Sequence, residues 1–175
     1  MARRVCLRET GPADVLKIEN VPTPDPKAGE VRIRVKAIGL NRAEVNLRAG
    51  TYGKPPKLPM PIGLEAAGTT DVIGAGVAER KVGDAVSVLP AFDTCTYGMY
   101  GDEVVAPARA VVRHPENISW EEAAATWMSF TTAWAGLVDY AGITPADFVS
   151  STQRQAVLGY RRFKSRIGRE PSRSR

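Results

Sequence analysis

Histidine and cysteine, which carry most metal-binding and nucleophilic chemistry, are scarce in this chain. There is one histidine, His114, and there are two cysteines, Cys6 and Cys95, in 175 residues. A single histidine excludes a two-histidine metal site, and isolated cysteines form neither a CxxC metal knuckle nor a disulfide framework. His114 precedes Pro115 at the end of an apolar run, which favours a surface or turn position. We interpret both cysteines as reduced, partly buried thiols.

Motifs for a nucleophilic serine and for a nucleotide phosphate are also absent from the sequence. It contains no GxSxG elbow and no GxxxxGK[ST] loop. The glycine-rich stretch at 74–76 lacks the third glycine and the following helix that a phosphate cradle needs, so it is typical of a hairpin turn. Polar side chains carried on loops therefore remain as the candidates for chemistry.

Five short motifs in a fixed order give the strongest functional indication. They are Gly39–Glu44 with Arg48–Gly53, then Pro61–Gly68, Val82–Val86, Tyr97–Gly101, and Glu122–Ala124 with Phe130–Ala133. Together, over residues 1 to 149, they resemble the N-terminal domain of the medium-chain dehydrogenase and reductase superfamily. The resemblance implies a mainly β fold with C-terminal helices, in which a GroES-like, partly open β-barrel precedes a truncated Rossmann domain.

Two positions indicate which branch of the superfamily the chain resembles. In zinc alcohol dehydrogenases a cysteine follows the strand before the first helix, and a His-Glu pair occupies the "GHE" step. Here those places hold Asn41 and Leu64-Glu65. An amide oxygen and an isobutyl group cannot replace a thiolate and an imidazole as zinc ligands. The resemblance therefore implies the zinc-free quinone oxidoreductase-like branch, whose members are often named zinc-type alcohol dehydrogenase-like, and no metal site.

The same resemblance implies an NADPH-dependent oxidoreductase that acts on a small enone, quinone or aldehyde. Without a metal, reduction depends on placing a hydride donor against an electron-poor carbon and on hydrogen bonds to the developing oxyanion. By the family pattern, Asn41 lies beside the nicotinamide and substrate, as a catalytic and cofactor-binding residue. Tyr52 lines the mouth of the cleft as a second catalytic residue, and Thr131 approaches the nicotinamide as a cofactor-binding residue.

Each of these residues also has an ordinary structural interpretation. Asn41 could be a turn residue with a local side-chain bond, Tyr52 a turn tyrosine, and Thr131 a helix N-terminal threonine. Glu65, in the same motif as Leu64, is interpreted as structural rather than as an acid or base.

Local patterns predict the elements that must position these residues. Alternation of apolar and charged residues over 31–37 predicts a half-buried strand, and further strands are expected at 68–73 and 85–89. Ser119 with Glu122 forms a capping box that predicts a helix start, and a second helix is expected over 131–140, ended by Gly142. Residues 147–149 are expected to open a buried strand. We predict a domain at 1–118, linking helices and a first Rossmann strand at 119–149, and a basic tail at 150–175.

The positive charge of the chain is confined to that tail. Residues 150–175 hold eight Arg or Lys and one acid, while the preceding residues are slightly acidic. In relatives a phosphate-cradling turn follows the strand matching 147–149, and here Ser, Gln and Arg replace it. We expect the tail to be disordered, and our hypothesis is out-of-frame translation; the alternative is a genuine basic tail for RNA or membrane binding.

The sequence also gives expectations about cellular location and binding partners. No apolar run is long enough for a signal peptide or a membrane span, which predicts a cytoplasmic protein that binds neither membrane nor nucleic acid. Loss of a cofactor domain would leave Trp127, Phe130 and Trp134 without a partner surface, so a homo-oligomer is possible. The chain alone is expected to be impaired in cofactor binding and inactive. The alternative function is a non-catalytic binding or oligomerising module.

Overall fold

The computed structural model describes residues 1–23, 25–53, 55–145 and 147–149. The chain divides into two compact units, Met1–Met128 and a second that begins at Ser129. Every strand among the described residues lies in the first unit, and the second unit holds most of the helix α3 (Trp127–Trp134). The domain boundary expected at residue 118 stays a prediction.

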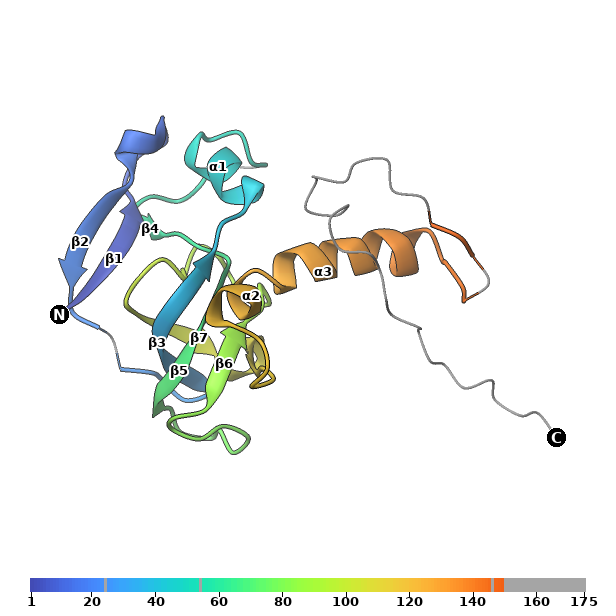
Figure 1. Cartoon of the computed structure of the whole chain (residues 1–175). Helices are drawn as coiled ribbons and strands as arrows, with labels where there is room; N and C mark the ends of the chain where they lie inside the picture. The colour runs from blue at the N-terminus through green and yellow to red at the C-terminus, as the bar shows by residue number, and fades with distance from the viewer. Residues whose placement is uncertain (24, 54, 146, 150–175) are drawn as a thin grey trace. The chain divides into compact units, whose positions relative to one another are not determined.

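A small three-stranded sheet lies at the N-terminal side of the first unit (Figure 1). It consists of β1 (Ala2–Leu7), β2 (Lys17–Val21) and β4 (Met60–Pro61), in the antiparallel order β2-β1-β4. A 3-10 turn at Ala13–Val15 precedes β2.

The larger sheet has five antiparallel strands in the order β7-β3-β5-β6-β8. Its strands are β3 (Glu30–Gly39), β5 (Glu65–Ile73), β6 (Ala85–Val88), β7 (Glu103–Pro107) and β8 (Val111–Arg113). The three strands expected from the sequence are confirmed, but β3 and β5 are longer than expected. Glu65 through Ala67 join β5 because both faces of the strand are buried there, so no alternation marks them.

The main core lies on one face of this sheet. Val31 and Ile33 of β3 are fully buried, and they pack with a cluster of apolar residues from the other strands. The other members are Ala66, Val86, Val88, Met99, Val104, Ala106, Ala110 and Val111. The edge strands β7 and β8 are not paired with each other in the sheet order, so the strands do not close into a barrel. The predicted class, mainly β with a partly open GroES-like architecture, is confirmed.

Helix α2 (Trp120–Ala124) packs on the sheet at β3 and β5. Its predicted capping box is confirmed: Ser119 N–H donates to Glu122 Oε2 at 2.9 Å, and Glu122 N–H donates to Ser119 Oγ at 3.1 Å. Ala123 and Ala124 are buried against Ala67 of β5. The small side chains let the helix approach the strands closely.

The predicted second helix is confirmed, with an earlier start. Helix α3 continues into a π-helical turn at Ala135–Tyr140, and Gly142 follows with a positive φ of 64°. The strand expected at 147–149 is wrong: these residues form no strand, and Phe148 is fully exposed. A strand needs a neighbour to pair its peptide groups, and no described segment pairs with these residues. The tail expectation for 150–175 lies outside the described residues.

The residues excluded from chemistry occupy unremarkable positions. Both cysteines are free thiols, and Cys6 is half-buried as expected, but Cys95 is exposed, so the expectation of a partly buried thiol is wrong for Cys95. His114 is half-buried in the connection after β8, where its ring packs edge-on against Trp120 with a centroid distance of 5.0 Å. His114 therefore has a packing role.

Candidate active site

Asn41 lies between β3 and helix α1 (Arg42–Arg48), at the N-cap position of the helix. Its backbone is extended, with φ −126° and ψ 148°, and its N–H donates to Glu44 Oε2 at 2.7 Å. Asn41 and Glu44 thus form a capping box, the same device that starts α2. Asn41 therefore has a structural use at the start of α1, and its side chain also contacts Glu65.

Glu44 is a buried carboxylate that connects three segments of the first unit. Besides the Asn41 N–H, it accepts hydrogen bonds from the Leu64 N–H at 2.8 Å and from the Tyr100 hydroxyl at 2.5 Å. Its side chain is 4% exposed, and burial raises the pKa of its carboxyl although these donors act in the opposite direction. Burial, together with the same contact, raises the pKa of Tyr100.

Glu65, at the start of β5, is a second buried carboxylate beside the first. Its Oε1 accepts from Asn41 Nδ2 at 3.1 Å, and its Oε2 accepts from the Met128 N–H at 3.0 Å. Burial raises the pKa of the Glu65 carboxyl, and the charge of Glu44 adds to this effect. With both oxygens engaged as acceptors, Glu65 has the structural role that the sequence predicts for it.

Two glycines of the motifs are required by close packing around these carboxylates. A Cβ on Gly39 would lie 2.4 Å from Glu65 Cγ and 2.5 Å from the Ala124 carbonyl oxygen. Gly63 has a φ of 110°, and a Cβ there would lie 2.5 Å from Tyr100 Cδ1. Both positions therefore need glycine for the site to assemble.

Of the three residues predicted for the site, Asn41 is the one that the structure places within this cluster. Tyr52 lies after α1 with a 55% exposed side chain, and its hydroxyl has no hydrogen bond to another described residue. Thr131 lies in α3, within the second unit. The roles of Tyr52 and Thr131 stay predictions.

Sequence reasoning missed Glu44 and Tyr100. The spacing of Asn41 and Glu44 is a capping-box spacing, which could have identified Glu44. Tyr100 lies within the Tyr97–Gly101 motif, but its contact with Glu44 spans 56 residues of sequence and has no local signature.

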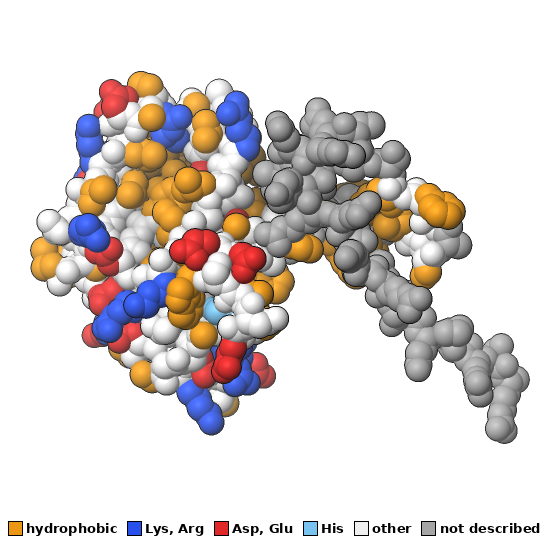
Figure 2. All heavy atoms as spheres, in the orientation of Figure 1, with side chains coloured by type: hydrophobic (Ala, Val, Ile, Leu, Met, Phe, Trp, Pro, Cys, Tyr) orange, Lys and Arg blue, Asp and Glu red, His pale blue; other side chains and the backbone are white. Residues whose placement is uncertain are grey.

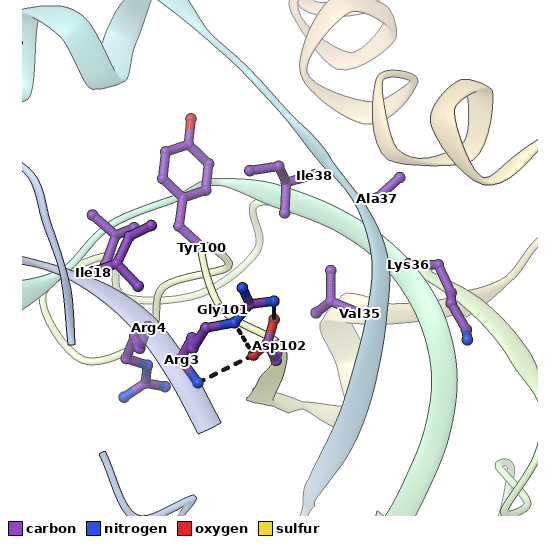
Figure 3. Close-up of a pocket in the computed structure, with 11 residues that line it drawn as sticks. Arg3, Arg4, Ile18, Val35, Lys36, Ala37, Ile38, Tyr100, Gly101 and Asp102 are labelled. Atoms are coloured by element: carbon purple, nitrogen blue, oxygen red, sulfur yellow. Dashed lines mark hydrogen bonds and ion pairs between the residues drawn. The ribbon is translucent and has the colours of Figure 1, made fainter. Parts of the chain in front are cut away.

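Tyr100 also lines a pocket of about 340 Å³ in the first unit, next to β1 and β3 (Figure 3). The Arg3–Asp102 ion pair lies among its lining residues, with Arg3 Nε 2.9 Å from Asp102 Oδ2. Tyr100 forms part of the wall and its hydroxyl points away from the ion pair. The remaining lining residues are Arg4, Val5, Ile18, Val35, Lys36, Ala37, Ile38 and Gly101.

Apolar side chains gather on the exposed surface of the same unit (Figure 2). Ile18 of β2, Ile38 of β3 and Val45 of α1 are exposed by 72%, 40% and 38%. Leu40, directly before Asn41, is exposed by 77%. Ile18 and Ile38 line the same pocket as Tyr100, and Leu40 precedes Asn41 in the sequence, so apolar side chains of this unit lie beside two members of the cluster.

Among the described residues, no group of three or more His, Cys, Asp or Glu is arranged to hold a metal ion. The chemistry that this cluster offers is hydrogen bonding by the Asn41 amide, which the buried carboxylates of Glu44 and Glu65 hold in place.

Residues 27–116 match the family described as the alcohol dehydrogenase GroES-like domain. The chain belongs to this family, within the medium-chain dehydrogenase and reductase superfamily. The rat synaptic vesicle membrane protein VAT-1 homolog is 37% identical over 149 residues, which cover 84% of this chain and 36% of that protein. The llama (Lama guanicoe) quinone oxidoreductase is 32% identical over 140 residues, which cover 79% of this chain and 41% of that protein.

A comparison with solved structures agrees with the sequence matches. The quinone oxidoreductase of Escherichia coli, crystallised with NADPH, matches with a TM-score of 0.68 at 30% identity. That match covers 79% of this chain and 41% of the bacterial enzyme. Some relatives are named for a vesicle membrane, but no helix among the described residues has the length and apolar content needed to cross a bilayer. The chain spans about 36% of the length of the VAT-1 homolog it matches.

Proposed function

We propose that this quinone oxidoreductase-like chain carries the substrate-facing part of an NADPH-dependent reductase of conjugated enones, quinones or aldehydes. The observation that supports this most is the Asn41 amide, held by Glu65 Oε1 at 3.1 Å at the point where β3 ends. An amide fixed in this way can hydrogen-bond a carbonyl without reorganising. Such a carbonyl occurs on the nicotinamide and on each proposed substrate class.

The residues present suit only one end of the cofactor. Asn41, and by our proposal Tyr52 and Thr131, would meet the nicotinamide and substrate, and bound NADPH would supply a hydride. A glycine-rich turn for the pyrophosphate does not occur in the sequence. We therefore expect NADPH binding by this chain alone to be weak and its turnover to be impaired.

NADPH titration followed by NMR tests the proposal, because NMR detects binding in the millimolar range. We expect the signals of Asn41, Tyr52 and Thr131 to move together as NADPH is added, and Asn41→Ala to abolish the shift. Asn20→Ala is a matched control, since Asn20 lies in β2 opposite Arg3 and outside the cluster. If no signal moves at millimolar NADPH, the reductase proposal is wrong, and the non-catalytic module becomes the better account.

Assembly and location belong to the same proposal. We expect a cytoplasmic protein with a small-molecule ligand and a tendency to form homo-oligomers. Sedimentation velocity over a range of concentrations would measure that tendency, and a monomer at every concentration would contradict it.

A further inference from the structure

The pocket beside Tyr100 lies between the small sheet and β3, and a short segment that ends at Asp102 joins its two sides (Figure 3). The Val5 N–H donates to the Tyr100 carbonyl oxygen at 2.9 Å, and the Asp102 N–H donates to the Arg3 carbonyl oxygen at 2.9 Å. On the other side, the Val35 N–H donates to the Asp102 carbonyl oxygen at 2.8 Å. Backbone hydrogen bonds therefore hold β1 and β3 on either side of the pocket before any ligand arrives.

Arg3 carries a guanidinium into this pocket in a fixed orientation. Its Nε and Nη2 donate to the two carboxylate oxygens of Asp102 at 2.9 Å and 3.0 Å. A guanidinium has five N–H donors, and no described residue other than Asp102 accepts from this one, so three donors remain. The Arg3 side chain is 68% exposed, and Figure 3 shows its guanidinium amid the side chains that line the pocket. The three donors are therefore accessible to a ligand.

Apolar side chains form the walls next to this guanidinium. Ile18 of β2 and Ile38 of β3 are exposed by 72% and 40%, and the Tyr100 ring lies on a third side. Val5 and Val35, which also line the pocket, are half-buried. A volume of about 340 Å³ lies within the range of small-molecule sites. The pocket therefore suits a compact apolar group.

The charges around the pocket favour an anion. Three cations, Arg3, Arg4 and Lys36, line it together with one acid, Asp102. Asp102 is paired with Arg3, whereas Arg4 and Lys36 form no ion pair within the part of the chain that the structure describes. In Figure 3 the charged ends of Arg4 and Lys36 point away from the centre of the pocket, so they raise the local positive potential without contacting a ligand.

We propose that this pocket, which we call the Arg3 pocket, is a second small-molecule site that binds an organic carboxylate with a compact apolar body. The carboxylate accepts from the remaining N–H groups of Arg3, because guanidinium and carboxylate form charge-assisted hydrogen bonds. The apolar body lies against Ile18 and Ile38. Asn41 is not among the residues that line the Arg3 pocket, so this site is separate from the proposed reductase function and needs no NADPH.

Titration of the full chain with benzoate, followed by ¹⁵N NMR, tests the proposal. We expect the backbone signals of Arg3, Ile38 and Gly101 to move together, with a Kd of roughly 1–10 mM, as is usual for a ligand of this size. Benzamide has the same ring without the charge, so it should bind at least about fivefold more weakly. Equal binding of the two probes overturns the proposal, and so does an absence of movement at about 50 mM benzoate.

A double variant removes the anion-binding group without changing the net charge of the chain. Arg3→Met combined with Asp102→Asn should weaken benzoate binding at least about tenfold. The matched control is Arg8→Met combined with Glu19→Gln, because Arg8 is 63% exposed and also donates to both oxygens of its partner, at 2.6 Å and 2.8 Å. Arg8 does not line the pocket, so the control should change the Kd by less than about twofold. Equal weakening by the two double variants overturns the role of Arg3.

A third variant tests the apolar wall. Ile18 is exposed, so Ile18→Ser leaves the core of the first unit intact. The substitution should weaken benzoate binding by about threefold, because the ring loses apolar contact area. Unchanged binding would place the ring outside the pocket and would overturn the proposal.

Dilution of the chain without benzoate distinguishes a small ligand from a second copy of the chain. If another copy covers the Arg3 pocket, the signals of Arg3, Ile38 and Gly101 will move as the chain is diluted, and the small-molecule site is then wrong. We expect these three signals to stay in place on dilution.

Discussion

The Tyr100 hydroxyl donates to Glu44 Oε2 at 2.5 Å, and this bond joins the segment before β7 to the first turn of α1. Glu44 is 4% exposed and Tyr100 is 9% exposed, so water does not replace either partner readily. A buried acceptor that loses its donor costs more than a surface one. The stability of the region around Asn41 should therefore depend on a hydroxyl that lies outside the motif containing Asn41.

Tyr100→Phe should lower the free energy of unfolding by about 1–3 kcal/mol, because the Glu44 carboxylate loses a buried donor. Urea denaturation at neutral pH measures the change. Tyr97→Phe is the matched control, since the Tyr97 hydroxyl donates to Glu30 Oε1 at 2.6 Å in a half-buried setting. A loss in Tyr97→Phe equal to or larger than that in Tyr100→Phe would contradict the argument from burial.

Gly63→Ala should destabilise the chain by about 3 kcal/mol or more, through a clash in addition to a strained backbone. The new methyl group would lie 2.5 Å from Tyr100 Cδ1 at a φ of 110°. Gly76→Ala has a similar strain, with a φ of 79°, but nothing lies within 4 Å of its Cβ. Thermal unfolding should place Gly76→Ala about 1 kcal/mol below the wild type, and equal losses at the two sites would rule out the clash.

The Trp127 indole N–H donates to Ser87 Oγ at 2.9 Å, and Ser87 is 2% exposed. A double-mutant cycle of Trp127→Phe and Ser87→Ala should give a coupling energy of about 1 kcal/mol, typical of one hydrogen bond. Trp134→Phe combined with Ser87→Ala provides the control pair, and its coupling should be near zero. Additive losses in the first cycle would show that the bond contributes nothing to stability.

Glu44 should make stability fall as the pH rises above its ordinary carboxyl value of 4.5. Burial raises the pKa of Glu44 in the folded state, so the folded chain holds that proton more tightly than the unfolded chain does. The favourable contribution is complete below 4.5 and is lost as the pH rises through the folded-state pKa. Because Gln does not titrate, the wild type should lose stability relative to Glu44→Gln as the pH rises.

Urea titrations across the acidic to neutral range measure this gap. The exposed Glu116→Gln serves as the control and should run parallel to the wild type. If the wild type instead gains stability relative to Glu44→Gln as the pH rises, the hydrogen-bond donors lower the pKa of Glu44 by more than its burial raises it.

Alternating patterns and capping boxes were the parts of the fold that could be predicted from sequence. The strand at 31–37 and the helix start at Ser119 follow from local chemistry and are found where expected. The strand expected at 147–149 failed because a short apolar run does not specify the partner strand that it needs.

The candidate site could be predicted only in part, for a physical reason. Asn41 is identifiable because its motif is local, whereas the Tyr100–Glu44 contact depends on how β7 and α1 are brought together. Tyr52 and Thr131 were predicted from the family resemblance alone, and no local sequence pattern predicts that either residue lies near Asn41.

The carboxyl of Glu65 holds the side chain of Asn41 with one oxygen and the first turn of α3 with the other. Anyone building chimaeras by exchanging the segment after Ala125 with that of another superfamily member should therefore treat Asn41, Glu65 and the start of the transplanted helix as one cassette. A graft that moves the Met128 amide would remove one of the two donors that hold the Glu65 carboxyl. The Glu65 side chain could then shift and displace the Asn41 side chain, although the sequence around Asn41 is unchanged.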